Sequence, residues 1–174
     1  MQLALDTAPT LEFRVAGVPQ PKGSKAIIGR HVRIAGRLAV VAPQLIESAD
    51  QPTKTHRRGR LRRWQAKVRA AASAAWRRAF GEQVPWDCSC ELAVEFVLPR
   101  PAGDWLRPGQ LRAGAREDCE VKPDLSKLVR AVEDALTGVV YTDDARVVRY
   151  GETWKRYAAW GGHGGAIVKV RPLR

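Results

Sequence analysis

The chain has 174 residues, of which 45% are hydrophobic and 28% charged, a composition that suits one globular domain and excludes a disordered or membrane-embedded class. Its 30 Lys and Arg residues exceed its 18 Asp and Glu residues, and the resulting net charge of +12 favours a polyanion such as nucleic acid as partner. The sequence shows neither the apolar run of a membrane span nor the pattern of a secretory signal, so we expect a single cytoplasmic domain over residues 1–174.

The N-terminal part predicts a strand, a loop and a hairpin. Apolar and polar residues alternate over residues 11–18, which is typical of a half-buried strand. Residues 19–25 combine proline and glycine with Lys22 and Lys25, which could contact phosphate, although an ordinary solvent loop explains the segment equally well. Residues 31–41 indicate a hairpin that turns at Ala35 and Gly36.

A strongly basic helix is predicted next. Residues 52–81 contain 10 basic residues and no acidic one. Apolar residues at helical spacing should face the core: Leu61, Trp64, Val68, Ala71, Ala72, Ala75 and Ala79. The basic side chains then turn outward and are candidate DNA contacts: Arg57, Arg58, Arg62, Arg63 and Lys67, together with Lys22 and Lys25 of the preceding loop. A merely solvated charged face is the alternative interpretation.

The remaining elements complete an α+β pattern. Residues 91–98 predict a strand, residues 99–120 a long mobile loop rich in Pro, Gly and Arg, and residues 145–157 another strand. A glycine-rich turn at 161–165 leads to a last short strand at 166–170. Together these elements predict one compact domain, in which two main helices pack on a small mixed sheet.

Acidic residues gather in one segment of this basic chain. Between residues 117 and 144 lie 8 of the 18 acids: Glu117, Asp118, Glu120, Asp124, Glu133, Asp134, Asp143 and Asp144. Because carboxylates repel phosphate, such a cluster in a phosphate-binding protein suggests a bridging divalent cation. Helix capping and surface ion pairs explain the acids equally well.

A second helix is predicted over residues 123–138, with Asp124 as its N-cap and Gly138 at its end. Its apolar arc leaves Lys127, Arg130 and Asp134 on the other side, where an ion pair between Arg130 and Asp134 is expected.

Asp143 and Asp144 follow at the entry of the next strand, where neighbouring residues face opposite sides. One of them should therefore point toward the N-terminus of the helix and form, with Asp124, an oxygen cradle suited to Mg²⁺.

These motifs resemble the RusA family of Holliday-junction resolvases, in particular its phage members. The family carries P-D-[IL]-D-N-L-x-K, then D-A-L, then D-D-A-[QR]-V. Here the corresponding runs are residues 123–130 (PDLSKLVR), 134–136 (DAL) and 143–147 (DDARV), and residues 17–24 (GVPQPKGS) also resemble phage members.

The resemblance implies a homodimer that binds a four-way DNA junction and nicks two strands symmetrically, in a bacterial or phage-infected cell. It implies Mg²⁺, with Mn²⁺ as a substitute ion, held by Asp124 and Asp144 with Asp143 as a further contributor. Arg130 stands where the family has a lysine, and a guanidinium can also stabilise charge on the phosphate.

Two positions depart from the family pattern, and both are candidate catalytic residues. Ser126 replaces the second helix aspartate and Lys127 replaces an asparagine. Either Ser126 acts through a metal-bound water, or Glu120 or Asp118 supplies the missing carboxylate, or the enzyme is weak. A branched-DNA-binding protein without catalysis is therefore the alternative function, and an RNA binder of the ribosome is a more distant one.

Overall fold

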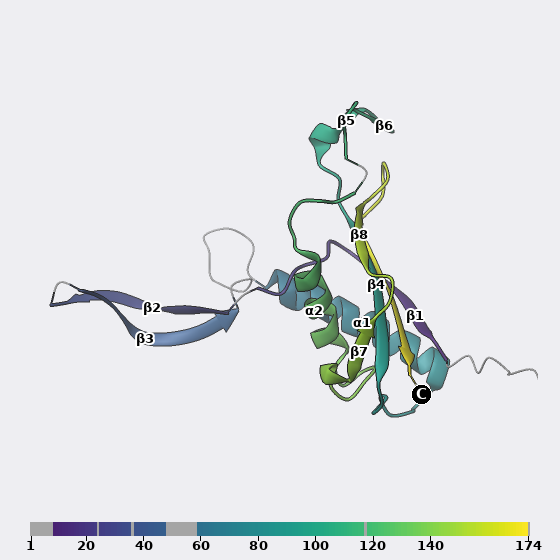
Figure 1. Cartoon of the computed structure of the whole chain (residues 1–174), viewed down its shortest axis with the longest axis horizontal. Coiled ribbons are helices and arrows are strands. Elements are labelled where there is room, and N and C mark those ends of the chain that lie inside the picture. The colour runs from purple at the N-terminus through teal and green to yellow at the C-terminus, as the bar shows by residue number, and fades with distance from the viewer. Residues whose placement is uncertain (1–8, 24, 36, 48–58, 117, 174) are drawn as a thin grey trace, which may run out of the picture.

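The computed structural model describes residues 9–23, 25–35, 37–47, 59–116 and 118–173; of the strands within 25–47 only the backbone is described. A mixed sheet forms its centre (Figure 1), in the order β1 (Leu11–Ala16), β9 (Gly165–Pro172), β4 (Cys90–Leu98) and β7 (Val147–Tyr150). A further strand, β8 (Trp154–Tyr157), also pairs with β4. β7 and β8 run parallel to β4, whereas β9 is antiparallel to both β1 and β4. The predicted mixed sheet is confirmed.

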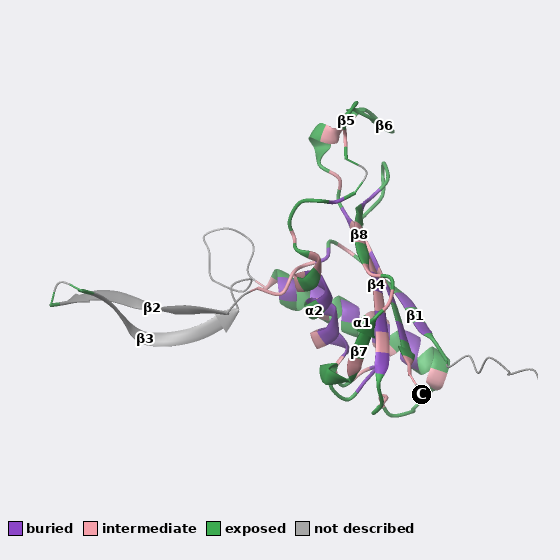
Figure 2. Ribbon diagram, in the orientation of Figure 1, coloured by how far each residue is buried: buried purple, intermediate pink, exposed green. Residues whose placement is uncertain are grey.

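One face of this sheet is apolar because alternate residues of each strand point to the same side. Phe13 of β1 lies opposite Val168 of β9, which lies opposite Val94 of β4, and all three are buried. Figure 2 shows this burial along the central strands and the inner sides of the helices. The period-2 pattern of the sequence is therefore the direct cause of the sheet's buried face.

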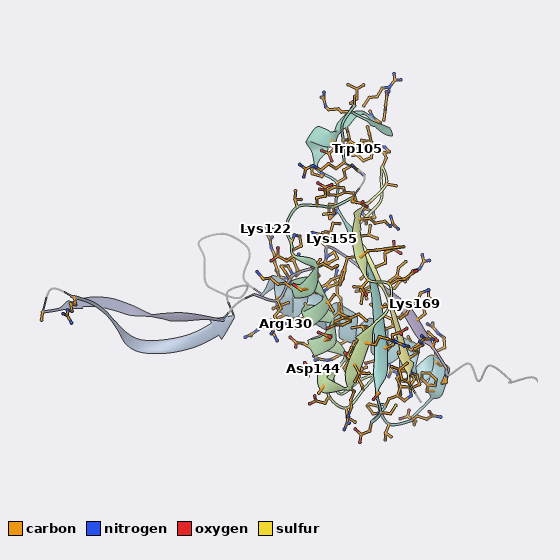
Figure 3. All side chains as sticks on the ribbon, viewed as in Figure 1. Trp105, Lys122, Arg130, Asp144, Lys155 and Lys169 are labelled. Atoms are coloured by element: carbon orange, nitrogen blue, oxygen red, sulfur yellow. The ribbon has the colours of Figure 1, made fainter. Side chains whose placement is uncertain are left out.

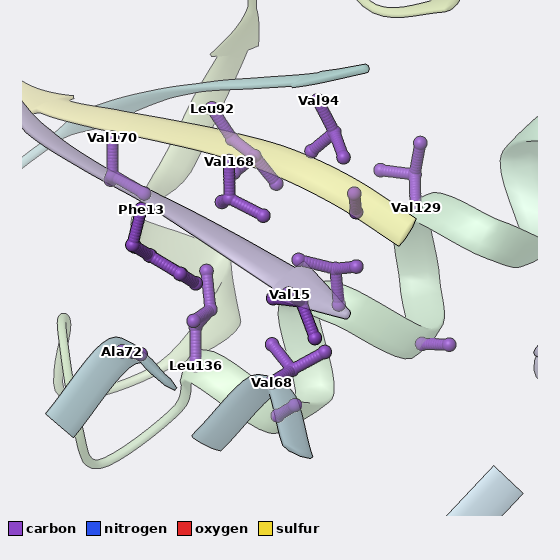
Figure 4. Close-up of a cluster of buried hydrophobic side chains, with 14 of the residues drawn as sticks. Phe13, Val15, Val68, Ala72, Leu92, Val94, Val129, Leu136, Val168 and Val170 are labelled. Atoms are coloured by element: carbon purple, nitrogen blue, oxygen red, sulfur yellow. The ribbon is translucent and has the colours of Figure 1, made fainter. Parts of the chain in front are cut away.

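Two helices cover that face: α1 (Arg60–Phe80) and α2 (Leu125–Leu136). Figure 4 shows Val68 and Ala72 of α1 and Leu136 of α2 beside the strand residues of the core. The predicted stripe of α1 is confirmed at Leu61, Trp64, Val68, Ala72 and Ala75, but Ala79 is exposed. None of the described helices is both long and apolar enough for a membrane span.

Trp76 is buried in α1, although the stripe predicted from the sequence omitted it. Its ring contacts those of Phe80 and Trp86, with centroid distances of 4.7 and 5.0 Å. Its indole Nε1 donates a 2.9 Å hydrogen bond to the Gln83 carbonyl. The aromatic cluster at the end of α1 therefore draws the helix onto Trp86, and Ala79 falls outside it.

A long hairpin projects from the body (Figure 1). It consists of β2 (Lys25–Ile34) and β3 (Arg37–Glu47), which pair antiparallel. The turn predicted at residues 35 and 36 is confirmed by the strand ends, but the strands extend well beyond the predicted 31–41. The irregular pairing between Ile28 and Arg30 interrupts the alternation of the strand, so the sequence pattern underestimates its length.

The segment predicted as a mobile loop, residues 99–120, contains local structure. It forms a short 3-10 turn, η2 (Ala102–Asp104), and a small hairpin of β5 (Trp105–Arg107) and β6 (Gln110–Leu111). Trp105 packs edge-on against Trp160 at a centroid distance of 4.9 Å. The Arg100 guanidinium lies 4.6 Å from the ring centroid of Tyr157. Contacts with residues distant in sequence hold this segment, and its mobility stays a prediction.

The predicted strand over residues 145–157 is divided in two. Gly151 lies between β7 and β8, and its N–H donates a 2.9 Å hydrogen bond to the Leu92 carbonyl of β4. A Cβ at this position would lie 3.1 Å from the Cβ of Ala93. Glycine therefore permits the close approach at which the chain leaves the edge of the sheet and returns to it.

The open face of the sheet carries ion pairs instead of a second apolar layer. The Glu91 carboxylate of β4 accepts hydrogen bonds of 2.9 and 3.2 Å from Arg171 of β9 and is also paired with Arg149 of β7. The hydrogen bond from Arg171, and then the charges of Arg149 and Arg171, lower the pKa of Glu91 despite its partial burial. The network links three strands of the sheet.

Replacing Glu91 by glutamine is expected to lower the free energy of unfolding by about 1 kcal/mol at pH 7. Because the pKa of Glu91 is lower in the folded chain, its stabilising effect is complete above the usual value of 4.5. The effect is lost as the pH falls through the lowered pKa. Urea unfolding at pH 7 and about pH 3 measures the difference, and Glu12→Gln, at the half-exposed pair with Lys169, is the control. Equal losses at both pH values would contradict this role.

Candidate functional site

Asp124 occupies the N-cap position of α2, as predicted, but its side chain does not cap the helix. Its carboxylate instead pairs with the Lys127 ammonium at 3.0 Å. That hydrogen bond and charge, followed by the charges of Lys122 and Lys155, lower the pKa of Asp124. The predicted capping role is therefore wrong, because a lysine one turn away competes for the carboxylate. Asp124 lies in positive surroundings.

One face of α2 carries Ser126, Arg130 and Glu133, since spacings of four and seven residues bring side chains to the same side of a helix. Ser126 and Arg130 are exposed. Glu133 is only 8% exposed and is the one buried charged side chain among the described residues. The sequence analysis counted Glu133 among the clustered acids but assigned it no role. Its seven-residue spacing from Ser126 was the signal that could have identified it.

Tyr150 of β7 holds Glu133 in place. Its hydroxyl donates a 2.6 Å hydrogen bond to Glu133 Oε1, and the buried Tyr141 hydroxyl donates to the Glu133 carbonyl at 3.2 Å. Partial burial, the bond to Glu133 and nearby negative charge raise the pKa of Tyr150 to about 12, so that its proton stays on the donor at neutral pH. Burial, more than any other effect, raises the pKa of Glu133, and the Asp144 charge adds to it.

Asp143 and Asp144 do not enter the strand directly. Asp143 Oδ1 accepts a 2.8 Å hydrogen bond from the Ala145 N–H and caps a 3-10 turn, η3 (Asp144–Arg146), which precedes β7. The prediction that both residues alternate on a strand is therefore wrong, because the capped turn replaces the extended backbone. Asp144 is exposed, and its charge raises the pKa of Glu133, Tyr141 and Tyr150.

The predicted ligands Asp124 and Asp144 lie toward different ends of α2. Figure 3 shows Asp144 near the C-terminal end of α2 and Lys122 near its N-terminal end. Nine residues separate Asp124 from Glu133, which corresponds to about 13 Å along a helix axis. The charges of both Asp144 and Arg130 act on Glu133, and a metal ion shared by Asp124 and Asp144 stays a prediction.

The proposed third carboxylates lie elsewhere. Glu120 is exposed and its carboxylate pairs with Arg116 at 3.3 Å. The backbone of Asp118 forms an isolated antiparallel bridge with Arg156 of β8. Across the described ranges no three His, Cys, Asp or Glu side chains are grouped closely enough to hold a metal ion. A magnesium ion needs only one or two protein carboxylates and completes its shell with water and phosphate, so the oxygen donors of Asp144 and Glu133 fit it.

The N-terminal loop is fastened to α2 through Asp134, next to the face that carries Arg130. The Lys22 ammonium pairs with Asp134 at 2.7 Å, and the Lys22 N–H donates a 2.8 Å hydrogen bond to the Lys127 carbonyl. The predicted ion pair between Asp134 and Arg130 is therefore wrong, because Asp134 faces the loop and Arg130 faces Glu133 and Tyr150. Lys22 can therefore contact a DNA phosphate only if its ion pair with Asp134 breaks.

The basic face of α1 is exposed as predicted. Arg62, Arg63 and Lys67 lie on its outer side, and the Lys67 ammonium donates a 3.4 Å hydrogen bond to the Ala16 carbonyl at the end of β1. The first turn contains no acidic residue. Arg57, Arg58 and the side chain of Lys25, which the sequence also indicated as DNA contacts, lie outside the described residues.

Comparison with known families gives one match of functional significance. Residues 44–171, which include both helices, the strands β4, β7 and β8 and nearly all of β9, match the family described as endodeoxyribonuclease RusA. A search of curated proteins finds no match to this chain.

Proposed function

The chain belongs to the RusA endodeoxyribonuclease family, and on that basis we propose that it resolves four-way DNA junctions by paired symmetric nicks in a Mg²⁺-dependent reaction. The observation that carries this proposal is the exposed Asp144 beside the buried Glu133, with Arg130 on the same side of α2, in a chain of net charge +12. The carboxylates at this position repel the DNA phosphates that the basic residues attract. A divalent cation bound between carboxylate and phosphate would remove this repulsion.

Asp144 and Glu133 are the carboxylates that would hold the metal. Asp143, whose Oδ1 is used by Ala145, and Asp124, which is paired with Lys127, stay predicted contributors. When bound, the ion supplies a Lewis acid for the scissile phosphate and favours deprotonation of an attacking water. Mn²⁺ has the same preference for oxygen ligands and is expected to substitute.

The protein's own side chains supply binding and orientation. Tyr150 fixes the Glu133 carboxylate through its hydrogen bond, and β7 thereby sets the distance between Glu133 and the turn that carries Asp144. The exposed Arg130 guanidinium can donate to two phosphate oxygens and stabilise the charge that develops on them. Arg62, Arg63 and Lys67 of α1 would hold the DNA backbone.

Two symmetric nicks require two such sites, so we propose a homodimer acting on branched DNA in the cytoplasm of a bacterial or phage-infected cell. Each protomer would cut one of two opposed strands. Sedimentation of the chain alone and with a junction measures both states, and one protomer per junction would contradict paired cleavage.

Cleavage of a synthetic four-way junction tests the proposed function. With Mg²⁺ or Mn²⁺ at millimolar concentration, we expect paired nicks at symmetric positions near the crossover and none in a linear duplex of the same sequence. EDTA should abolish cleavage and leave binding in a mobility-shift assay.

A specific observation favours one alternative. Ser126 stands where the family has a carboxylate, and the Asp124 carboxylate is paired with Lys127. Junction binding without cleavage in either metal would identify the chain as a branched-DNA-binding protein that lacks catalysis.

A further inference from the structure

A cavity of about 640 Å³ opens beside Asp124, on the other side of α2 from Glu133. Three chain segments enclose it, residues 18–21, 98–101 and 119–123, together with the first turns of both helices. Its volume lies in the range of about 300 to 1,000 Å³ that is typical of sites for small organic groups. The function proposed above uses none of its apolar lining.

The walls of the cavity are held by hydrogen bonds between distant segments. Lys155 of β8 donates bonds of 2.7 and 2.8 Å to the carbonyls of Val121 and Pro123. The Lys22 contacts with Asp134 and Lys127 fasten the opposite wall to α2. The cavity is therefore preformed, and a ligand would not have to order these segments on binding.

The interior and the rim differ in chemistry. Leu98, Cys119 and Tyr157 line the cavity and are each less than 10% exposed, so their surfaces form an apolar floor. The rim carries Arg60, Lys122 and Lys127. Among the described residues of the lining, Asp124 is the only acidic one, and it is paired with Lys127. Such a site fits a flat apolar group that is attached to a negatively charged one.

We propose that this cavity receives the base of one nucleotide at the crossover of the branched DNA, swung out of its pair, with the adjoining phosphate on its basic rim. The proposal rests on the proposed function, because a DNA substrate bound along α2 is what would bring a nucleobase and its phosphate to the cavity. A nucleobase is planar, has apolar faces and is joined to phosphate on both sides. Swinging a base out of its pair costs less where its stacking is already interrupted, as it is on the crossover side of the base pairs that flank a branch point.

Binding of a base in the cavity would make the affinity of the enzyme for junctions higher than its affinity for duplexes. In a duplex each base is stacked on both sides, and only the phosphates reach the rim. At a crossover the base can enter as well and bury its faces on the floor.

Junctions with one abasic nucleotide test the proposal. We expect the full-length chain to bind a junction that lacks one crossover base about tenfold more weakly than an intact junction, in EDTA to prevent cleavage. Fluorescence anisotropy measures both affinities at one salt concentration. Equal affinity at every crossover position would overturn the proposal.

A variant that fills the cavity provides the second arm. Val18 lines the cavity and is 48% exposed, so tryptophan there can occupy the interior. Val18→Trp should bind intact and abasic junctions equally, while Val84→Trp, at an 81% exposed position outside the cavity, should keep the difference. Val121→Trp is a second filling variant if Val18→Trp does not fold. Discrimination that persists in a folded filling variant would overturn the proposal.

The outcomes separate this proposal from the function on which it rests. A chain that does not prefer junctions to duplexes fails the proposed function. A chain that prefers junctions but ignores the missing base fails the cavity proposal alone and indicates that the basic rim holds only the phosphate backbone.

Discussion

Replacing Asp144 by asparagine is expected to reduce junction cleavage by about 100- to 1,000-fold while leaving junction binding within about twofold. Asparagine keeps the size of the side chain and removes the charge that a metal ion requires. Because the Asp144 side chain is exposed, the change should not affect folding. Single-turnover cleavage and mobility shifts with the same labelled junction measure the two effects.

The matched control is Glu12→Gln, which removes one carboxylate from the open face of the sheet, where Glu12 pairs with Lys169 at 3.3 Å. It alters the net charge equally and should cleave normally. A cleavage loss in both variants would show that total charge, and not the position of Asp144, controls the rate.

Direct binding of Mn²⁺ extends this prediction to the other carboxylates. Electron paramagnetic resonance of added Mn²⁺, without DNA, should show affinity weakened about 10- to 100-fold by Asp144→Asn or Glu133→Gln. Asp124→Asn should weaken it less, because Asp124 lies at the other end of α2 beside lysines. Equal losses for Asp124→Asn and Asp144→Asn would mean that both residues hold one ion, as the sequence motif suggests.

Reversing the charges of Arg62 and Arg63 should weaken junction binding at least about tenfold and lower the slope of log affinity against log salt by about 2. Both residues are exposed in the first turns of α1, and Arg63 lines a small hollow together with Gly17 and Gln20 of the N-terminal loop. Each phosphate contact releases counterions, so a lost contact reduces the salt dependence as well as the affinity. Titrations of labelled junction between low and moderate salt measure the slope.

The same helix supplies a control with an identical charge change. Arg77 and Arg78 lie in its last turn, about 20 Å farther along the axis, and are exposed. Reversing them should change the slope much less if the DNA follows the N-terminal end of α1. Equal effects of the two pairs would attribute binding to net charge alone and remove the first turns of α1 from the interface.

The period of hydrophobic residues was sufficient to predict the core elements. Alternation placed Phe13 and Val94 on one face of the sheet, and helical spacing placed Val68 and Leu128 against it. These predictions depend only on which side of an element a residue occupies, a property that local geometry sets. The division at Gly151 and the hairpin of β5 and β6 were missed, because they depend on contacts with Ala93 and Trp160 that no local pattern contains.

The candidate site was predicted less completely. The motif identified Asp144 and Arg130 as candidates. Which acidic side chain forms an ion pair with which basic one depended on the elements that meet in the folded chain. Asp134 bonds to Lys22 of the N-terminal loop instead of Arg130, and Asp124 pairs with Lys127 instead of capping the helix. Several partners of opposite charge lie within reach of each side chain, and their choice follows from the folded positions of whole segments.

The sequence by itself determined the α+β architecture, the family and the basic face of α1, because periodicity, motif order and net charge are properties of the chain. Only the tertiary structure revealed that Glu133 is buried beside Asp144 under the Tyr150 hydroxyl, and that three segments enclose the cavity next to Asp124. Both features arise where residues far apart in the sequence meet. Their chemistry is set by burial and by neighbouring charge, which a linear pattern does not encode.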